Sequence, residues 1–395
     1  MSDKAKLARR AFIRRCAAGA AALAWGGYAA RSLLLRGADG GLRIGWRNDA
    51  PGSLTPWSRE ASWYDRAAGG TAAAVQCRLC PHECILGEND RGFCRTRVVK
   101  GGKLYSLVYG NPCAVHVDPI EKKPLYHFHP GSAVLSLATA GCNLRCLNCQ
   151  NWEISQARPE ETDNIDLPPE RLAAECRAAG IPAIAYTYSE PGVFYEYVYD
   201  SAHKGRAQGL KNVLVTAGYI NEPPLRQLAE VIDAANVDVK SFSPAVYRKL
   251  CGASLAPVLG AVELLRREGV WVEITRLMVP EYSDRLEDIK EMARWMVQTL
   301  GPDVPLHISR FHPAYRLSAL PSTPLETLRR AWETAREAGL YHVYIGNAPE
   351  SGSEDTSCPG CGRLLIERRG MGILLNRLAA GGRCSCGREI SGVWS

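Results

Sequence analysis

The sequence has little of what a membrane-spanning or nucleic-acid-binding protein needs. The uncharged run from Cys16 to Ala30 is only 15 residues long and rich in alanine and glycine, whereas a membrane-spanning helix needs about 20 apolar residues. The net charge is +7, but residues 1–15 contribute +5 of it, so the remaining 380 residues carry about +2. This small net charge argues against nucleic-acid binding by the chain after residue 15.

The stretch TAGCNLRCLNCQNWEISQ, residues 139–156, lacks a fourth cysteine beside Cys142, Cys146 and Cys149. A closed zinc site needs four ligands. A disulfide framework needs an even number of cysteines, and turns this short rarely permit pairing. Three thiolates around a cubane iron–sulfur cluster would leave one iron without a protein ligand and open to a small molecule.

The N-terminus has the composition of a targeting segment. The basic segment Arg9–Arg14, which begins with two arginines, precedes the uncharged run, and residues 1–33 are similar to a twin-arginine signal or anchor. We expect export by that route or association with a membrane, and a cytoplasmic protein with a basic tail is the alternative. Residues 34–70, with several glycines and prolines, are predicted to be a linker.

The region 131–350 alternates short apolar runs with amphipathic segments. Runs such as AVLSLAT, IPAIAYTY, NVLVTAG and NVDVKS have the composition of buried strands, and segments such as PPLRQLAEVIDAA have that of helices. This alternation predicts an α/β fold with a parallel sheet covered by helices, in the form of a partial (β/α)6-type TIM-like barrel. Chemistry in such barrels lies at the C-terminal ends of the strands, and the cysteine triplet directly follows the first strand.

Two further cysteine groups flank the predicted barrel. A Cys-rich module over 71–130 and a zinc-ribbon-like module over 351–395 are expected, with these quartets: Cys77, Cys80, Cys84 and Cys94; Cys358, Cys361, Cys384 and Cys386. The C-terminal quartet predicts one tetrahedral zinc, although its second knuckle is C-x-C, one residue shorter than usual. The N-terminal quartet fits zinc, a second cluster or disulfides. The isolated cysteines are interpreted as plain thiols: Cys16, Cys113, Cys176 and Cys251.

The ordered set of motifs from residue 75 to 395 resembles a known family. It comprises CRLCPHEC, KPLYHFHPG, GCNLRCLNCQNWEISQ, AYTYSEP, DVK, HISRFHP, YIGNAP and ISGVWS. The set resembles the radical S-adenosylmethionine (SAM) enzymes of the AmmeMemoRadiSam system, which are related to the activases of glycyl-radical enzymes such as pyruvate formate-lyase. The resemblance implies a [4Fe-4S] cluster on Cys142, Cys146 and Cys149, SAM on its open iron, and reductive cleavage of SAM to a 5′-deoxyadenosyl radical.

The resemblance also implies residues that contact SAM. Glu190 in TYSEP would accept a charge-assisted hydrogen bond from the SAM ammonium, or would be a surface acid beside a turn. Asp238 and Lys240 in DVK lie two residues apart on one strand face. They would contact SAM, with Lys240 meeting its carboxylate, or would form a structural ion pair.

Four residues at late strand ends are candidates for facing the substrate: Arg276, His307, Arg310 and His312. For either histidine a structural role is the alternative. His127 and His129 in KPLYHFHPG are expected to pack the entry segment over the mouth of the cluster without being ligands.

The partners implied are SAM, a low-potential electron donor and, through the family, Memo-type and AMMECR-type proteins; no nucleic acid is expected. The substrate is left unassigned, because substrate contacts lie on variable loops of a shared barrel. Two alternative functions are an activase that acts on a glycyl-radical enzyme, and an iron–sulfur electron-transfer or metal-binding protein without SAM chemistry.

Overall fold

The computed structural model describes residues 44–45, 53–67, 74–348 and 352–394. The predicted signal or anchor, residues 1–33, lies outside these ranges. Within them, no helix combines the length and the apolar character that crossing a membrane requires.

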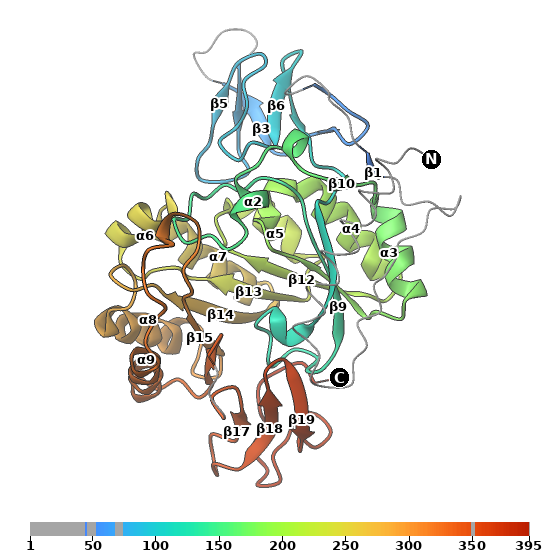
Figure 1. The fold of residues 1–395 in the computed structure, drawn as a ribbon. Helices are drawn as coiled ribbons and strands as arrows, with labels where there is room; N and C mark the ends of the chain where they lie inside the picture. Colours follow the sequence, from blue (N-terminus) through green and yellow to red (C-terminus); the bar gives the residue numbers. More distant parts are fainter. Residues whose placement is uncertain (1–43, 46–52, 68–73, 349–351, 395) are drawn as a thin grey trace, which may run out of the picture.

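One eight-stranded sheet organises the chain, with a small module beyond each end of its strands (Figure 1). Seven strands run parallel, and β8 pairs antiparallel with β9 at one edge. The sheet is open, and its order is β16-β15-β14-β13-β12-β11-β9-β8. The strands are β8 (Ala114–Pro119), β9 (Ala133–Ala138), β11 (Ala183–Tyr186), β12 (Lys211–Thr216), β13 (Ala234–Asp238), β14 (Trp271–Met278), β15 (Leu306–Arg310) and β16 (Val343–Gly346).

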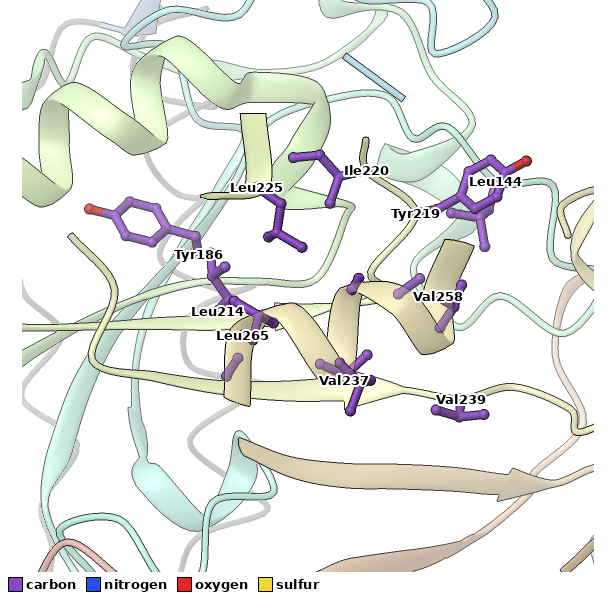
Figure 2. Packing of buried hydrophobic residues seen from close by; sticks show 14 of the residues in the cluster. Leu144, Tyr186, Leu214, Tyr219, Ile220, Leu225, Val237, Val239, Val258 and Leu265 are labelled. Atoms are coloured by element: carbon purple, nitrogen blue, oxygen red, sulfur yellow. The ribbon is translucent and has the colours of Figure 1, made fainter. Parts of the chain in front are cut away.

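Helices follow most of these strands and cover one face of the sheet, as the alternation of apolar and amphipathic segments predicts. They are α3 (Pro169–Ala178), α4 (Tyr195–Ala207), α5 (Glu222–Ala229), α6 (Pro244–Cys251), α7 (Leu255–Arg267), α8 (Leu286–Thr299) and α9 (Leu325–Glu337). The short α2 (Trp152–Ser155) follows the cysteine triplet. Figure 2 shows Val258 and Leu265 of α7 packed beside Val237 of β13.

The two faces of the sheet carry side chains of different size. Leu135 and Ile184 point toward the helices, within the large core. Their neighbours Val134, Ala183 and Ala185 point the other way, into a second, smaller cluster. Because this second face is lined by small side chains, it has room for the segment before β9, which includes the 3-10 turn η1 (Ile120–Lys122) and buries Leu125 and Phe128 there.

The N-terminal module is built from two three-stranded antiparallel sheets, β2-β7-β6 and β3-β4-β5. Its strands are β2 (Arg59–Glu60), β3 (Tyr64–Arg66), β4 (Val75–Cys77), β5 (Ile85–Leu86), β6 (Arg97–Lys100) and β7 (Lys103–Ser106). A further pair joins β1 (Ile44–Gly45) to β10 (Asn164–Ile165).

The structure draws the domain boundaries differently from the sequence prediction. Residues 59–66, which the sequence prediction placed in the linker, contain β2 and β3. The prediction missed these strands because short exposed edge strands have no clear apolar pattern. Residues 114–119, placed in the N-terminal module, are the edge strand β8 of the main sheet. The sheet therefore begins before the predicted boundary at 131.

The C-terminal module consists of β17 (Thr356–Ser357), β18 (Leu364–Arg369) and β19 (Gly372–Asn376) around a core of its own. Its last residues pair with the segment before β9: His129 donates its backbone N–H to the Val393 carbonyl at 2.7 Å, and Val393 donates to the His127 carbonyl at 2.7 Å. The expectation that His127 and His129 pack over the cluster mouth is therefore wrong. They lie at the N-terminal end of β9, whereas the cysteine triplet follows its C-terminal end.

Candidate functional site

The loop of the cysteine triplet begins at a glycine that no other residue can replace without displacement. Gly141 has φ +89°, and a Cβ there would lie 2.3 Å from the Thr96 Cγ2 and 2.6 Å from the Cys94 carbonyl oxygen. The loop is held from the other side by α6, because the backbone N–H of Arg145 donates to the Cys251 carbonyl at 2.8 Å. The triplet is thus fixed between the N-terminal module and the end of α6.

The three thiols of this loop are each partly buried, at the C-terminal edge of the sheet. Burial raises the pKa of Cys142 well above its usual value, and the nearby Glu190 carboxylate raises it further. The thiol of Cys149 lies 3.2 Å from the Ser155 hydroxyl. Three sulfurs on one short loop fit three corners of a cubane cluster, and binding iron would displace their protons.

Glu190 lies buried beside this loop, 4% exposed, after the end of β11. One carboxylate oxygen accepts hydrogen bonds from the Thr216 hydroxyl and the Gly192 N–H, and the other accepts from the Ala217 N–H at 2.8 Å. Burial raises the pKa of this carboxyl, and the hydrogen bonds oppose that rise. A carboxylate can accept about four hydrogen bonds, so the second oxygen keeps one acceptor position for a ligand cation.

Lys240 follows β13 and forms an ion pair with Asp238 at 2.9 Å. Burial acts to lower the pKa of Lys240, but the charges of Asp238 and Cys146 outweigh it, so this pKa lies well above its usual value. The ammonium also acts electrostatically on Glu190. The structure therefore brings all three predicted SAM-contacting residues to the edge that carries the cysteine triplet.

Cys251, interpreted from the sequence as a plain thiol, belongs to this site. It ends α6 and is fully buried, and its interaction with the Cys146 thiol lowers the pKa of Cys146. No spacing rule could have found it, because more than a hundred residues separate the two cysteines. The contact arises only from the packing of α6 against the loop.

The four substrate-facing candidates separate into two pairs. Arg276 is fully buried and donates to the Ser283 carbonyl at 3.0 Å. His307 lies in the first half of β15, where its Nε2 is 2.7 Å from the Glu273 carboxylate. Arg276 therefore holds the loop after its own strand, and His307 belongs to the N-terminal half of the sheet. Arg276 also donates to the Val239 carbonyl at 3.4 Å, next to Lys240. That Arg276 and His307 face the substrate stays a prediction.

Arg310 and His312 lie at the edge that carries the cysteine triplet. Arg310 ends β15 and donates its Nε–H to the Thr323 carbonyl at 2.8 Å. His312 is exposed, with its Nε2 3.2 Å from the Asn347 carbonyl and its Nδ1 3.3 Å from the Ser322 hydroxyl. These two residues stay candidates for contact with a substrate.

Sequence reasoning missed a polar group on the face of the sheet opposite the helices. Asp118 of β8 accepts hydrogen bonds from Lys123, at 2.7 Å, and from the Tyr188 hydroxyl. Burial lowers the pKa of Lys123 to about 8, although Asp118 opposes that shift. The signal available in the sequence was the place of Tyr188 in TYSEP, two residues before Glu190. The structure adds that Tyr188 has the unusual φ of +61°.

The C-terminal quartet has the geometry of a site for a single metal ion. The Sγ atoms of Cys358, Cys361, Cys384 and Cys386 all lie within 4.8 Å of one another. Cys358 and Cys386 are separated by 3.6 Å between sulfurs, and Cys361 and Cys384 by 3.7 Å. Tetrahedral zinc with Zn–S bonds of about 2.3 Å requires sulfurs about 3.8 Å apart, so the short C-x-C knuckle does not prevent the arrangement.

Three clustered thiols beside a buried carboxylate and a lysine, at one edge of the parallel sheet of a mixed α/β fold, fit a site for an iron–sulfur cluster and a small charged ligand. Residues 136–296 match the model of the Radical SAM superfamily. The chain is also 46% identical over 310 residues to the uncharacterized protein MJ0808 of Methanocaldococcus jannaschii, covering 78% of this chain and 91% of that protein. The chain belongs to the radical SAM superfamily.

Two further relatives are more distant. The chain is 25% identical over 151 residues to the pyruvate formate-lyase 1-activating enzyme of Escherichia coli K12, covering 36% of this chain and 60% of that enzyme. A solved domain of a pyruvate-formate lyase-activating enzyme from Bacteroides vulgatus aligns with a TM-score of 0.37 and 15% identity, over 41% of this chain and 98% of that domain.

Proposed function

We propose that the chain is a radical SAM enzyme of the AmmeMemoRadiSam type, with the main sheet acting as a partial (β/α)6 barrel. Cys142, Cys146 and Cys149 would hold a [4Fe-4S] cluster. When bound, that cluster supplies the electron that cleaves SAM into methionine and a 5′-deoxyadenosyl radical. The proposal rests on one observation, that Glu190 and Lys240 both lie beside the cysteine loop.

The two SAM-binding residues have complementary charges for the two ends of the methionine part of SAM. Glu190 keeps an acceptor position for the ammonium, and Lys240 offers a cation to the carboxylate. A pair of this kind orients the sulfonium toward the open iron and holds it out of water. An iron–sulfur protein without SAM chemistry has no need for a buried carboxylate and an ammonium at the loop, so this alternative is less well supported.

The test is to measure 5′-deoxyadenosine and methionine formed by the anaerobically reconstituted and reduced protein. Cys142→Ala, Cys146→Ala and Cys149→Ala should each abolish both products, because each removes one of the three thiolates. Cys176→Ala, a buried cysteine of α3 away from the loop, is the matched control. If any of the three variants cleaves SAM at the parental rate, the assignment fails.

An activase for a glycyl-radical enzyme is the second candidate. The similarity to the pyruvate formate-lyase 1-activating enzyme favours it. Incubating the reduced protein and SAM with a glycyl-radical enzyme should produce a glycyl radical signal if this candidate is correct. Memo-type and AMMECR-type proteins are the partners that the first proposal suggests, and co-purification with them would support it.

We also propose zinc in the C-terminal quartet, and export or membrane association through residues 1–33. The first proposal is supported by the sulfur separations and the second by the sequence of the segment. A cytoplasmic protein is the alternative location, and it is favoured by the need for SAM and a low-potential electron donor.

A further inference from the structure

The N-terminal quartet surrounds a cavity. All four of its cysteines line one small cavity, of about 20 Å³, between the N-terminal module and the sheet. The other walls are mostly apolar and include Leu79, Leu86, Phe93 and Val193. Phe93 is 37% exposed, so the site is close to the surface. Four thiols that face one apolar space are a ligand set for zinc or for a cubane iron–sulfur cluster.

The spacing of the sulfurs separates this quartet from the C-terminal one. Among the described residues, the C-terminal quartet meets the spacing that a single ion requires, and no three cysteines of the N-terminal quartet do. The cysteine triplet of the SAM site does not meet it either. In a cubane cluster the inorganic core stands between the cysteine sulfurs, so these are farther apart than around one zinc.

Two polar groups at the cavity are suited to a cluster with negative charge. Arg97 is 1% exposed, lines the cavity and forms an ion pair with Glu196 at 2.8 Å. Its buried Nε–H has no hydrogen-bond partner within the described part of the chain. The Thr96 hydroxyl lies 3.2 Å from the Cys94 sulfur. Donors near cluster sulfurs stabilise the reduced, more negative state and tune the reduction potential.

The quartet also touches the loop of the SAM site directly. The Cys94 carbonyl oxygen approaches Gly141, the residue before Cys142. His82, two residues after Cys80, places its Nε2 2.8 Å from the Asn143 carbonyl oxygen, and Asn143 follows Cys142 in the chain. Asn143 also lines the quartet's cavity. Cys94 is therefore linked to Cys142 through one contact at Gly141, and Cys80 is linked to Cys142 through the hydrogen bond between His82 and Asn143.

We propose that Cys77, Cys80, Cys84 and Cys94 hold a second [4Fe-4S] cluster, which relays electrons to the cluster of the SAM site. The electron-relay role rests on the proposed function; the metal assignment does not. One electron passes from a reduced low-potential iron–sulfur protein to the N-terminal cluster and then to the SAM cluster. The donor is oxidised by one electron and the SAM cluster is reduced by one electron, and no proton or bond changes in the relay itself.

Metal content tests the second cluster independently of SAM chemistry. The triple variant Cys142→Ala, Cys146→Ala, Cys149→Ala, reconstituted anaerobically, should retain about four iron and four sulfide per chain, with a cluster signal in electron paramagnetic resonance after reduction. Adding Cys80→Ala and Cys84→Ala should remove that iron. Adding Cys113→Ala instead, a lone cysteine on another part of the chain, should leave it in place.

Two outcomes would overturn the second cluster. The triple variant could hold less than one iron per chain, or it could hold a second zinc that is lost with Cys80 and Cys84. Thr96→Val provides a milder check, because it should retain the iron but lower the reduction potential through loss of the hydroxyl beside Cys94. An unchanged potential in a potentiometric titration of Thr96→Val would place the cluster elsewhere.

The relay is tested by comparing two reductants. With Cys80→Ser and Cys84→Ser in the otherwise complete chain, 5′-deoxyadenosine formation driven by reduced ferredoxin should fall at least ten-fold more than formation driven by dithionite. Equal losses with both reductants, or no loss with ferredoxin, would refute the relay. If even the parental chain makes no 5′-deoxyadenosine, the proposed function fails while the iron measurement still decides the second cluster.

Discussion

Glu190 offers the sharpest test of how the site binds SAM. Glu190→Gln keeps the size of the side chain and removes its charge. The carboxylate accepts three hydrogen bonds within the protein, from Thr216, Ala217 and Gly192, and keeps one acceptor position. In the variant, an amide NH2 replaces one oxygen, so a buried donor such as the Ala217 N–H loses its acceptor.

The expected magnitudes follow from these contacts. A hydrogen bond to a charged group contributes about 1.5–3 kcal/mol, so the dissociation constant for SAM should rise about 10- to 150-fold. The unpaired buried donor should lower the free energy of unfolding by about 1–3 kcal/mol. The loss of affinity should therefore be accompanied by a modest loss of stability, and the fold should survive.

Anaerobic calorimetric titration with SAM measures the affinity, and denaturant unfolding measures the stability. Glu263→Gln, an exposed glutamate on α7, is the matched control and should change neither. Iron content must be equal in all three proteins for the comparison to hold. If Glu190→Gln binds SAM with the parental affinity at equal iron content, Glu190 does not receive the ammonium and the reasoning is refuted.

Four other predictions address separate parts of the chain. Lys240→Met should weaken SAM binding about ten-fold or more while leaving iron unchanged, because it removes the cation opposite the SAM carboxylate; parental affinity by titration would make the pair with Asp238 purely structural. Cys361→Ser should remove about one zinc per chain and lower the melting temperature without loss of iron, since metal binding and folding are coupled in small sites; metal analysis that finds no zinc in the parent would exclude this assignment. Burial lowers the pKa of His342 to about 4. Its protonation is thus disfavoured in the folded state, so stability should fall by up to about 3 kcal/mol as the pH drops from about 6.5 to 4, and His342→Gln should flatten this part of the unfolding profile. A fusion of residues 1–40 to a reporter active only outside the cytoplasm should be active, and activity that survives Arg9→Lys with Arg10→Lys would rule out the twin-arginine route.

Much of the fold could be predicted because its elements are local. Buried parallel strands are near-continuous apolar runs, and the helices between them are amphipathic, so the sequence marks both. The edge strands β2, β3 and β8 were misassigned for the opposite reason. Two or three exposed residues, or a strand with one partner, leave too weak a pattern to distinguish from a linker.

The site was predictable to the extent that spacing defines it. The triplet Cys142, Cys146 and Cys149 lies on one loop, and Glu190 and Lys240 follow strands whose ends meet at the same edge. The roles of Arg276 and His307 could not be decided from the sequence, because alternation along a strand tells which face a side chain takes, but not whether that face is filled. The packing of the loop after β14 and of the segment before β9 decides that.

By itself the sequence determined which residues are chemically able to hold metal, because thiol spacing along a short loop limits the possible ligand sets. It left open what each quartet holds. Only the tertiary structure places the C-terminal sulfurs within 4.8 Å of one another and leaves the N-terminal ones around a cavity beside Gly141. Distances between sulfurs on different strands depend on how whole elements pack, and that packing is encoded in contacts between residues far apart in the chain.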